Sequence, residues 1–215
     1  RHQRRLLTWL TEPEVDALLA APDRSTWAGR RDHAMLVVAV QTGLRISELM
    51  ALTRNDVNLD VGAHVRCIGK GRKERATPLT KLTVAVLRDW LAEHTGDAHD
   101  PLFPTRTGTH LSYDAIEHRL AGHLATSHAN RPSLRAKHVT MHTLRHTAAM
   151  RLLHAGVDIA VIALWLGHEQ IATTNLYLHA DMNQKERAIA RVTPPNSTPG
   201  RYQPPDPLLA FLDSL

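Results

Sequence analysis

The sequence predicts an α+β fold that is mainly α-helical and carries a small antiparallel β-sheet insert. Three observations support this prediction. Most of the 215 residues lie in segments whose apolar residues recur at helical spacing and whose ends carry capping residues. One segment, residues 57–79, instead has the pattern of short strands around a glycine-rich turn. The apolar fraction of 43% is typical of a globular protein.

Helices are predicted wherever apolar residues repeat at intervals of three and four. The first begins at the capping box formed by Thr11 and Glu14, and Pro22 ends it. Glycines that follow the repeats, such as Gly43 and Gly156, end two others. The further predicted helices span Arg31–Val40, Ile46–Leu52, Val84–Glu93, Ser112–Ala125, His142–His154, Asp158–Leu166, and a last stretch from Thr173 or Thr174 to about Arg191.

The predicted sheet follows the third helix. Apolar residues between Val57 and Cys67 lead into the cationic turn Gly69-Lys70-Gly71-Arg72-Lys73, and Arg75–Leu79 resumes in extended form. Two short strands joined by this turn are therefore expected.

Composition limits the classes of function only loosely. Lys and Arg outnumber Asp and Glu by 26 to 21, which gives a formal charge of +5 and indicates a polyanionic partner. Cys67 is the only cysteine, so no internal disulfide can form, and a reducing cytosol suits the chain. The longest apolar run, Ala34–Val40, is too short to cross a bilayer.

Six residues stand out as candidates for chemistry. Each has an ordinary explanation when taken alone: an arginine can be a surface cation, a lysine a turn residue, a His–Arg pair a solvated helix face, and a tyrosine a core aromatic. What distinguishes them is the sequence around each one. They are Arg45, Lys70, His142, Arg145, His168 and Tyr177.

The local sequences around these six residues resemble the tyrosine recombinase, or phage-type integrase, family, with a Xer-like pattern. The resemblance covers roughly residues 11–191 and consists of five boxes in the family's order. Tyr177 comes nine residues after His168, and His168 comes 23 residues after Arg145. The boxes are Thr42-Gly43-Leu44-Arg45-Ile46-Ser47-Glu48-Leu49, Gly69-Lys70-Gly71-Arg72-Lys73-Glu74-Arg75, His142-Thr143-Leu144-Arg145-His146-Thr147, Leu166-Gly167-His168 and Thr173-Thr174-Asn175-Leu176-Tyr177-Leu178-His179.

The resemblance implies the catalytic fold of this family and a reaction on the DNA backbone. Tyr177 would attack a phosphodiester and form a covalent 3′-phosphotyrosyl bond. Arg45 and Arg145 would hold the non-bridging oxygens, because a guanidinium binds two oxygens at once and stays charged. A later attack by a 5′-hydroxyl would rejoin strands, so neither ATP nor a metal cofactor is expected.

The remaining site residues take supporting roles under the same resemblance. His142 would transfer the proton of the phenol, His168 would bind a non-bridging oxygen, and Lys70 would protonate the leaving 5′-hydroxyl. Glu48 would orient the catalytic side chains without itself contacting the substrate. Four further cations are expected to contact DNA: Lys73, Arg75, Arg119 and Lys137.

The resemblance also divides the chain into three parts. Residues 1–10 are interpreted as the end of an interdomain linker, residues 11–193 as the recombinase catalytic domain, and residues 194–215 as a proline-rich linker with a C-terminal helical tail. The chain begins with Arg1 and lacks an initiator Met, which predicts a fragment or a processed product. The charged start is not a secretory signal.

The expected partner is double-stranded DNA, bound in the cytoplasm at the nucleoid, with no membrane involved. A homotetramer on DNA is expected, and the tail would dock either on its own domain or on a neighbouring protomer.

Three alternatives remain open from the residues alone. A DNA-binding module that never cuts would explain the arginines equally well but has no need of Tyr177. A type IB topoisomerase shares the chemistry. A metal enzyme would use the 15 histidines, but Ala172 stands where a zinc-binding helix that starts at His168 requires its second ligand.

Overall fold

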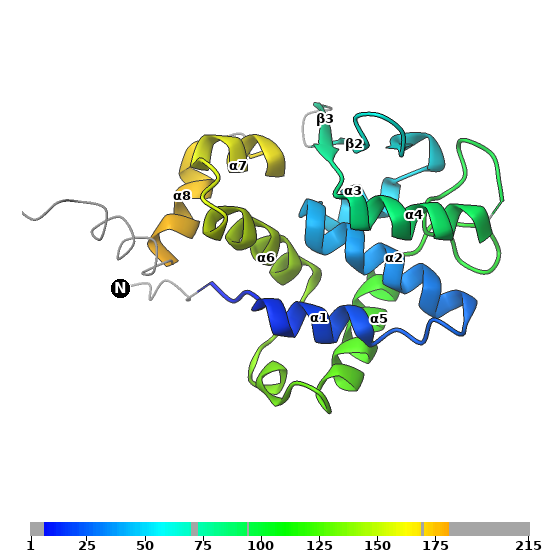
Figure 1. Ribbon diagram of the computed structural model, residues 1–215, viewed down its shortest axis with the longest axis horizontal. Coiled ribbons are helices and arrows are strands. Elements are labelled where there is room, and N and C mark those ends of the chain that lie inside the picture. Colours follow the sequence, from blue (N-terminus) through cyan, green and yellow to red (C-terminus); the bar gives the residue numbers. More distant parts are fainter. Residues whose placement is uncertain (1–6, 70–72, 94, 169, 181–215) are drawn as a thin grey trace, which may run out of the picture. The chain divides into compact units, whose positions relative to one another are not determined.

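The computed structural model describes residues 7–69, 73–93, 95–168 and 170–180. The chain divides into a unit of residues 1–180 and a unit of residues 181–215, and all described residues belong to the first. This unit is mainly helical with a small antiparallel sheet, as predicted (Figure 1). Its elements are α1 (Glu12–Ala20), α2 (Trp27–Thr42), α3 (Ile46–Ala51), η1 (Arg54–Asp56), β1 (Val57–Asn58), β2 (His64–Ile68), β3 (Glu74–Pro78), α4 (Lys81–Glu93), α5 (Tyr113–Ser127), η3 (Pro132–Ala136), α6 (Met141–His154), α7 (Ile159–Leu166) and α8 (Ile171–Ala180).

Helix α2 is the element around which the others pack, since it contacts α1, α4 and α6 (Figure 1). It begins at Trp27, earlier than the predicted Arg31, because Thr26 caps it by accepting a hydrogen bond from the N–H of Gly29. The prediction missed this first turn because glycine and arginine interrupt the apolar repeat there. Gly43 ends the helix as predicted, with a left-handed φ of 64°.

The sheet has three strands in the order β1-β2-β3, and both pairings are antiparallel. The predicted hairpin is β2–β3, in which Cys67 lies opposite Arg75. The additional strand, β1, is only two residues long and pairs Val57 with Val65. Residues 70–72 of the predicted turn, including Lys70, lie outside the described residues.

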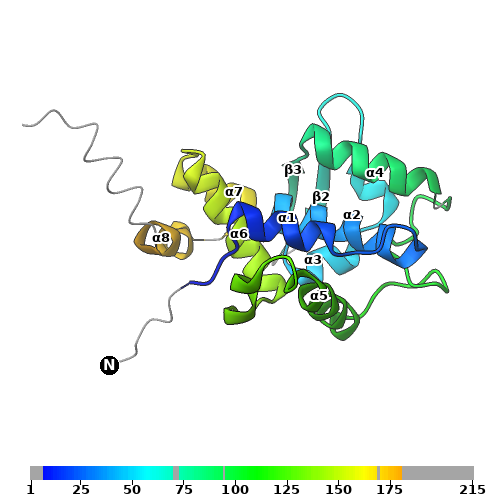
Figure 2. The ribbon, with the colours of Figure 1, turned by 60° about the horizontal axis from the view of Figure 1, so that its bottom comes forward.

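Helix α1 packs between α2 and α5, and the two views of Figures 1 and 2 agree on this arrangement. The predicted capping box is present: the N–H of Thr11 donates to the carboxylate of Glu14 at 2.8 Å. Leu10, the last residue of the expected linker, is buried, and its N–H donates to the hydroxyl of Thr147 at 3.0 Å. The folded unit therefore includes Leu10.

Helices α6, α7 and α8 contact one another and share an apolar core cluster of their own. Thr140 caps α6 and Asp158 caps α7, while Gly167 ends α7 with a φ of 64°. Helix α8 begins at Ile171, earlier than predicted, and its predicted end near Arg191 lies outside the described residues. Thr174 does not cap this helix, because it lies inside it, and its hydroxyl is instead bonded to the ring of His168.

None of the helices within the described ranges combines the length and the apolar character needed to cross a membrane.

Candidate active site

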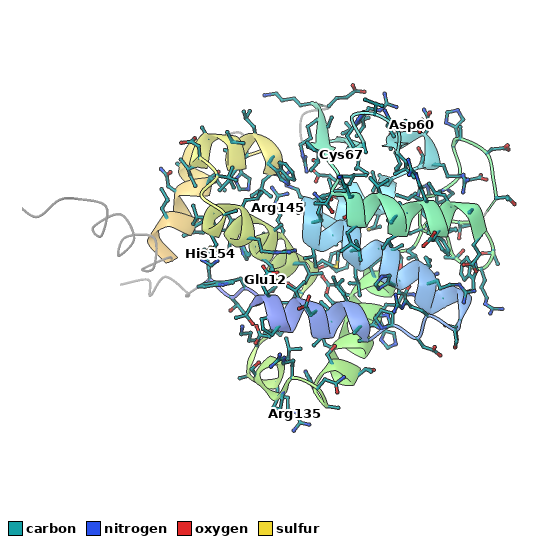
Figure 3. The ribbon with its side chains drawn as sticks, in the orientation of Figure 1. Glu12, Asp60, Cys67, Arg135, Arg145 and His154 are labelled. Carbon is teal, nitrogen blue, oxygen red and sulfur yellow. The ribbon has the colours of Figure 1, made fainter. Side chains whose placement is uncertain are left out.

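Two buried or half-buried arginines meet at the C-terminal end of α7. Arg145, on α6, is 3% exposed and donates to the carbonyl oxygens of Gly43 and Leu166, both at 2.6 Å. Arg45, at the start of α3, donates to the carbonyl of Gly167 at 3.0 Å. The two guanidiniums thus bind consecutive carbonyls of one helix end, where the helix dipole is negative. Figure 3 shows Arg145 within the folded unit.

The proximity of Arg45 affects the pKa of Arg145. Burial lowers the pKa of Arg145 to about 10, and repulsion by Arg45 adds to this effect. Arg145 remains charged at neutral pH. Its bonds to carbonyls use two of the five N–H donors of a guanidinium, so others remain for a ligand.

A cavity of about 360 Å³ opens beside these arginines, between the start of α3 and the start of α6. Its wall combines the two guanidiniums, the ring of His142 and the N-terminal turn of α6. Glu117 is the one carboxylate among its lining residues. The lining residues are Leu44, Arg45, Ile46, Ser47, Tyr113, Glu117, Thr140, Met141, His142 and Arg145. A cavity of this composition suits a small anionic group.

The Glu48 carboxylate holds the Arg45 side chain in place, and Arg75 in turn holds Glu48. Arg75 donates two bonds to the Glu48 carboxylate, at 2.8 and 2.7 Å, and Arg45 donates to the same carboxylate at 2.8 Å from its side chain. Burial alone would raise the pKa of Glu48, but the bonds from Arg75 and Arg45 outweigh it and hold this pKa below its usual value. Glu48 is therefore an anion held between two cations.

The sequence suggested Arg75 as a DNA contact, and in the structure its side chain is held by Glu48. Its side chain is 12% exposed, and both terminal nitrogens are bound to Glu48. Arg75 comes from β3, so the hairpin reaches the site through this residue. Its position is that of a support for Glu48.

Tyr177 lies in the same region and is only 3% exposed. Its hydroxyl is 3.1 Å from Nδ1 of His146, a residue that sequence reasoning did not select. The ring of His168 stacks on the Tyr177 ring with 6.4 Å between centroids, and Nδ1 of His168 is 2.7 Å from the hydroxyl of Thr174. The phenol is thus enclosed by two imidazoles.

His142 and His146 lie one helical turn apart on α6, and their rings make an edge contact with 4.3 Å between centroids. The i, i+4 spacing was the signal that could have identified His146, but no pattern in the sequence connects it with Tyr177.

Burial keeps these aromatic groups neutral at physiological pH. It lowers the pKa of His146 and that of His168 to about 4, with repulsion by neighbouring positive groups adding to it. Burial also raises the pKa of the Tyr177 phenol, against an opposing effect of Arg145.

Of the other cations predicted to contact DNA, Lys73 lies near this cluster, whereas Arg119 and Lys137 make ion pairs with other carboxylates. Lys73 is exposed beside a cavity that Gly167 and His168 also line. Arg119 pairs with Asp32 at 3.3 Å, and Lys137 pairs with Glu14 at 2.6 Å. Each of these pairs leaves the cation partly exposed, so their contacts with DNA stay predictions.

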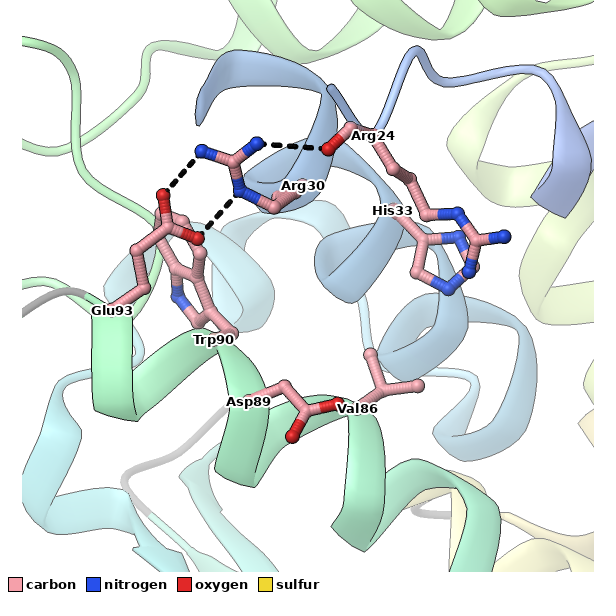
Figure 4. Close-up of a pocket in the computed structure, with 7 residues that line it drawn as sticks. All are labelled: Arg24, Arg30, His33, Val86, Asp89, Trp90 and Glu93. Atoms are coloured by element: carbon pink, nitrogen blue, oxygen red, sulfur yellow. Dashed lines mark hydrogen bonds and ion pairs between the residues drawn. The ribbon is translucent and has the colours of Figure 1, made fainter. Parts of the chain in front are cut away.

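A second cavity, of about 290 Å³, is separate from this cluster and lies against α2 and α4 (Figure 4). Arg30 spans its rim by donating to Glu93 and to the carbonyl of Arg24. Asp89 and His33 complete a wall of mixed charge. This wall has no net preference for an anion, unlike the cavity at Arg45 and Arg145.

Among the described residues, no group of three or more His, Cys, Asp or Glu side chains is arranged so that it could hold a metal ion.

The fold is that of a tyrosine recombinase catalytic domain. The chain belongs to the phage integrase family, whose sequence profile matches residues 8–184.

Related proteins agree with this assignment. A Sinorhizobium fredii protein named as a candidate integrase/recombinase, y4rC, is 56% identical over 215 residues, which are 100% of this chain and 65% of the relative. The tyrosine recombinase XerD of Pseudomonas putida is 39% identical over 175 residues, which cover 79% of this chain and 56% of XerD. The chain therefore spans less than two thirds of the length of these relatives.

Solved structures show the same fold. The recombinase XerH, bound to its palindromic difH substrate in a post-cleavage complex, is 26% identical with a TM-score of 0.71, over 87% of this chain and 54% of XerH. The XerA recombinase is 25% identical with a TM-score of 0.73, over 90% of this chain and 67% of XerA.

Proposed function

We propose that this chain is the catalytic part of a site-specific DNA recombinase or integrase that cleaves and rejoins strands through Tyr177. The observation that carries the proposal is the shared location of four groups: Arg45 and Arg145 on consecutive carbonyls of α7, His168 one residue further on, and Tyr177 stacked on that histidine. This set combines two arginines that can bind an anion, here called the clamp, with a nucleophile, Tyr177.

The chemistry follows from the charges. A phosphodiester gains negative charge on its non-bridging oxygens as a phenol attacks it, and preorganised guanidiniums stabilise that charge without a metal. Loss of one such donor typically costs about 3 kcal/mol, or roughly a hundredfold in rate. Arg45 and Arg145 take this role, with His142 at the cavity wall and His168 beside the phenol as further donors to the phosphate.

Glu48 and Arg75 position the clamp, and Lys70 gives its proton to the departing 5′-oxygen. In the cleavage step the Tyr177 oxygen forms a bond to phosphorus while the bond from phosphorus to the 5′-oxygen breaks. The products are a 3′-phosphotyrosyl bond and a free 5′-hydroxyl. Attack of a 5′-hydroxyl from another duplex reverses the step, so no ATP is consumed and no metal cofactor is needed.

Double-stranded DNA is the proposed partner, and a tetramer on DNA the proposed assembly. XerH was solved on its difH substrate, which supports the choice of DNA. Lys73, Arg119 and Lys137 would contribute phosphate contacts, and the site of action would be the nucleoid in the cytoplasm. Exchange between two duplexes needs four strand cleavages, hence four protomers.

The tail from residue 194 onward would couple the protomers of that assembly. Leu208, Leu209, Phe211, Leu212 and Leu215 fall at helical spacing on a proline-rich tether. Deletion of residues 206–215 should impair assembly on DNA more than it impairs cleavage. Recombination unchanged by this deletion would exclude the coupling role.

The decisive experiment traps the covalent intermediate. A lightly nicked library of random-sequence duplexes is incubated with the chain, and protein-linked DNA is recovered and sequenced. A defined suicide duplex, nicked a few nucleotides downstream of the recovered cleavage position, then quantifies the adduct. We expect a tyrosine-linked 3′-phosphate with the natural chain and no adduct with Tyr177→Phe, although both bind the duplex.

Two results would contradict the proposal. Binding without any adduct, with the natural chain and Tyr177→Phe indistinguishable, would indicate a DNA-binding module that does not cut. Adducts accompanied by relaxation of supercoiled circles, but never by strand exchange, would indicate a topoisomerase.

A further inference from the structure

The Tyr177 phenol must lose its proton as it attacks phosphorus, and the sequence pointed to His142 as the group that takes this proton. In the structure, His142 and the neighbouring His146 occupy different places relative to the phenol. His142 is exposed at the wall of the cavity that Arg45 and Arg145 line. His146, one turn further along α6, is the imidazole whose Nδ1 lies 3.1 Å from the phenol oxygen.

The surroundings of His146 suit a proton acceptor. At 3.1 Å, the distance to the phenol lies within hydrogen-bond range. A neutral imidazole accepts at Nδ1 when Nε2 carries the ring hydrogen, so the phenol can donate along this bond. The ring edge-contacts His142 on one side and Tyr177 on the other, with 5.6 Å between the centroids of His146 and Tyr177.

We propose that His146 is a catalytic residue that accepts the Tyr177 proton during cleavage and returns it during rejoining, while His142 binds the phosphate. The inference rests on the proposed function. In cleavage, the proton moves from the phenol to Nδ1 of His146 as the oxygen–phosphorus bond forms and the bond to the 5′-oxygen breaks. In rejoining, the same proton goes back to the departing phenolate.

The titratable and charged groups around His146 set its basicity. His142 and Arg145 face it from α6, His168 from the segment before α8, and Tyr177 from α8. Burial and the neighbouring His142 and Arg145 lower the pKa of His146 to about 4 in the free protein, which keeps it unprotonated and able to accept. A bound phosphodiester adds negative charge near these cations and raises that pKa, so His146 becomes a stronger base when its substrate arrives.

The test compares substitutions that separate hydrogen bonding from proton transfer. His146→Asn keeps an acceptor oxygen near the position of Nδ1 but cannot take a proton, and asparagine has a helix propensity similar to that of histidine. His142→Asn is the competing variant, and His118→Asn, at an exposed position of α5, is the control. All are measured in the 215-residue chain by adduct formation on the suicide duplex, with duplex affinity recorded in parallel.

We expect His146→Asn to bind the duplex normally but to form the adduct roughly a hundredfold more slowly, in line with the usual contribution of general base catalysis. Replacement of Tyr177 by a fluorinated tyrosine, whose phenol ionises at lower pH, should recover most of this loss. A packing defect would not be repaired by a more acidic phenol. His118→Asn should match the natural chain.

Three outcomes would overturn the inference. An unchanged adduct rate for His146→Asn would exclude a role in proton transfer. A slow His146→Asn that the fluorinated tyrosine does not accelerate would indicate packing alone. Rescue of His142→Asn, and not of His146→Asn, by the fluorinated tyrosine would identify His142 as the base. The proposed function fails separately, since in that case the natural chain forms no adduct.

Discussion

Arg75 grips both oxygens of Glu48, at 2.8 and 2.7 Å, and Glu48 in turn holds Arg45. A bidentate arginine–carboxylate pair is geometrically rigid. The β2–β3 hairpin is thereby tied to the start of α3, so a residue that resembles a surface cation in the sequence instead helps to place an anion-binding group. This relationship separates Arg75 from its neighbour Lys73, which is exposed.

The two cations should therefore differ in the salt dependence of DNA binding. Each phosphate contact contributes about 0.9 to the slope of log affinity against log salt. Lys73→Ala should reduce this slope by about that amount. The double variant Glu48→Gln with Arg75→Gln, which removes the buried carboxylate together with its bidentate partner, should leave the slope unchanged. Filter binding across a salt series measures both, after urea unfolding has shown that the variants fold. A drop of about 0.9 in the double variant would restore Arg75 as a phosphate contact.

Gly167 should resist substitution for two separable reasons. Its φ is 64°, and a Cβ there would lie 2.7 Å from a terminal nitrogen of Arg75 and 3.1 Å from two of its carbons. The left-handed conformation alone costs an alanine about 1 kcal/mol. Gly62 has a φ of 75° with nothing within 4 Å of the added Cβ, so Gly62→Ala is the matched control.

We expect Gly167→Ala to lose more stability to urea than Gly62→Ala and, in addition, to slow adduct formation, because the displaced Arg75 loosens Glu48 and Arg45. Equal losses of stability in the two variants, with an unchanged adduct rate for Gly167→Ala, would show that the contact with Arg75 has no consequence.

Local features of the fold were predictable because they depend on a few neighbouring residues. The caps at Thr11, Ser112 and Asp158, and the stop at Gly43, follow from side chains and φ preferences within one turn. The start of α2 was not predictable, because its first turn is held by the Thr26 cap and lacks an apolar repeat. The strand β1 was missed because two residues carry no periodicity.

The site could be predicted only as far as its residues lie in distinctive boxes. The boxes identified Arg45, Arg145, His168 and Tyr177, and the structure brings these four together. They carried no information about which side chains meet across elements. The bond between His146 and Tyr177 spans 31 residues and that between Arg75 and Glu48 spans 27, so both depend on tertiary packing.

Thr174 should matter to activity through its bond to His168. Its hydroxyl lies 2.7 Å from Nδ1 of His168, and the residue is fully buried. Thr174→Val keeps the shape and removes this bond, which is worth about 1 kcal/mol. Adduct formation should fall by up to about tenfold, while Thr174→Ser retains the rate. Thr173→Val, exposed on the same helix, is the control. Equal rates for Thr174→Val and Thr173→Val would exclude a positioning role for Thr174.

Mild acid should destabilise the fold through its buried histidines. The pKa of His146 and that of His168 are about 4 in the folded chain, against 6.5 for an unperturbed imidazole, chiefly because of burial. Between these pH values the unfolded chain binds more protons than the folded chain, so the stability due to these histidines is complete above about pH 6.5 and falls as the pH drops toward about 4.

Glu14, Asp32 and Glu48 add a similar loss of stability only at lower pH, because carboxylates in the unfolded chain protonate near pH 4. Urea midpoints measured from pH 7.5 to pH 5 should therefore decline for the natural chain and decline less steeply for His146→Asn, whereas His118→Asn should follow the natural chain. A midpoint independent of pH over this range would mean that neither imidazole is held neutral by the fold.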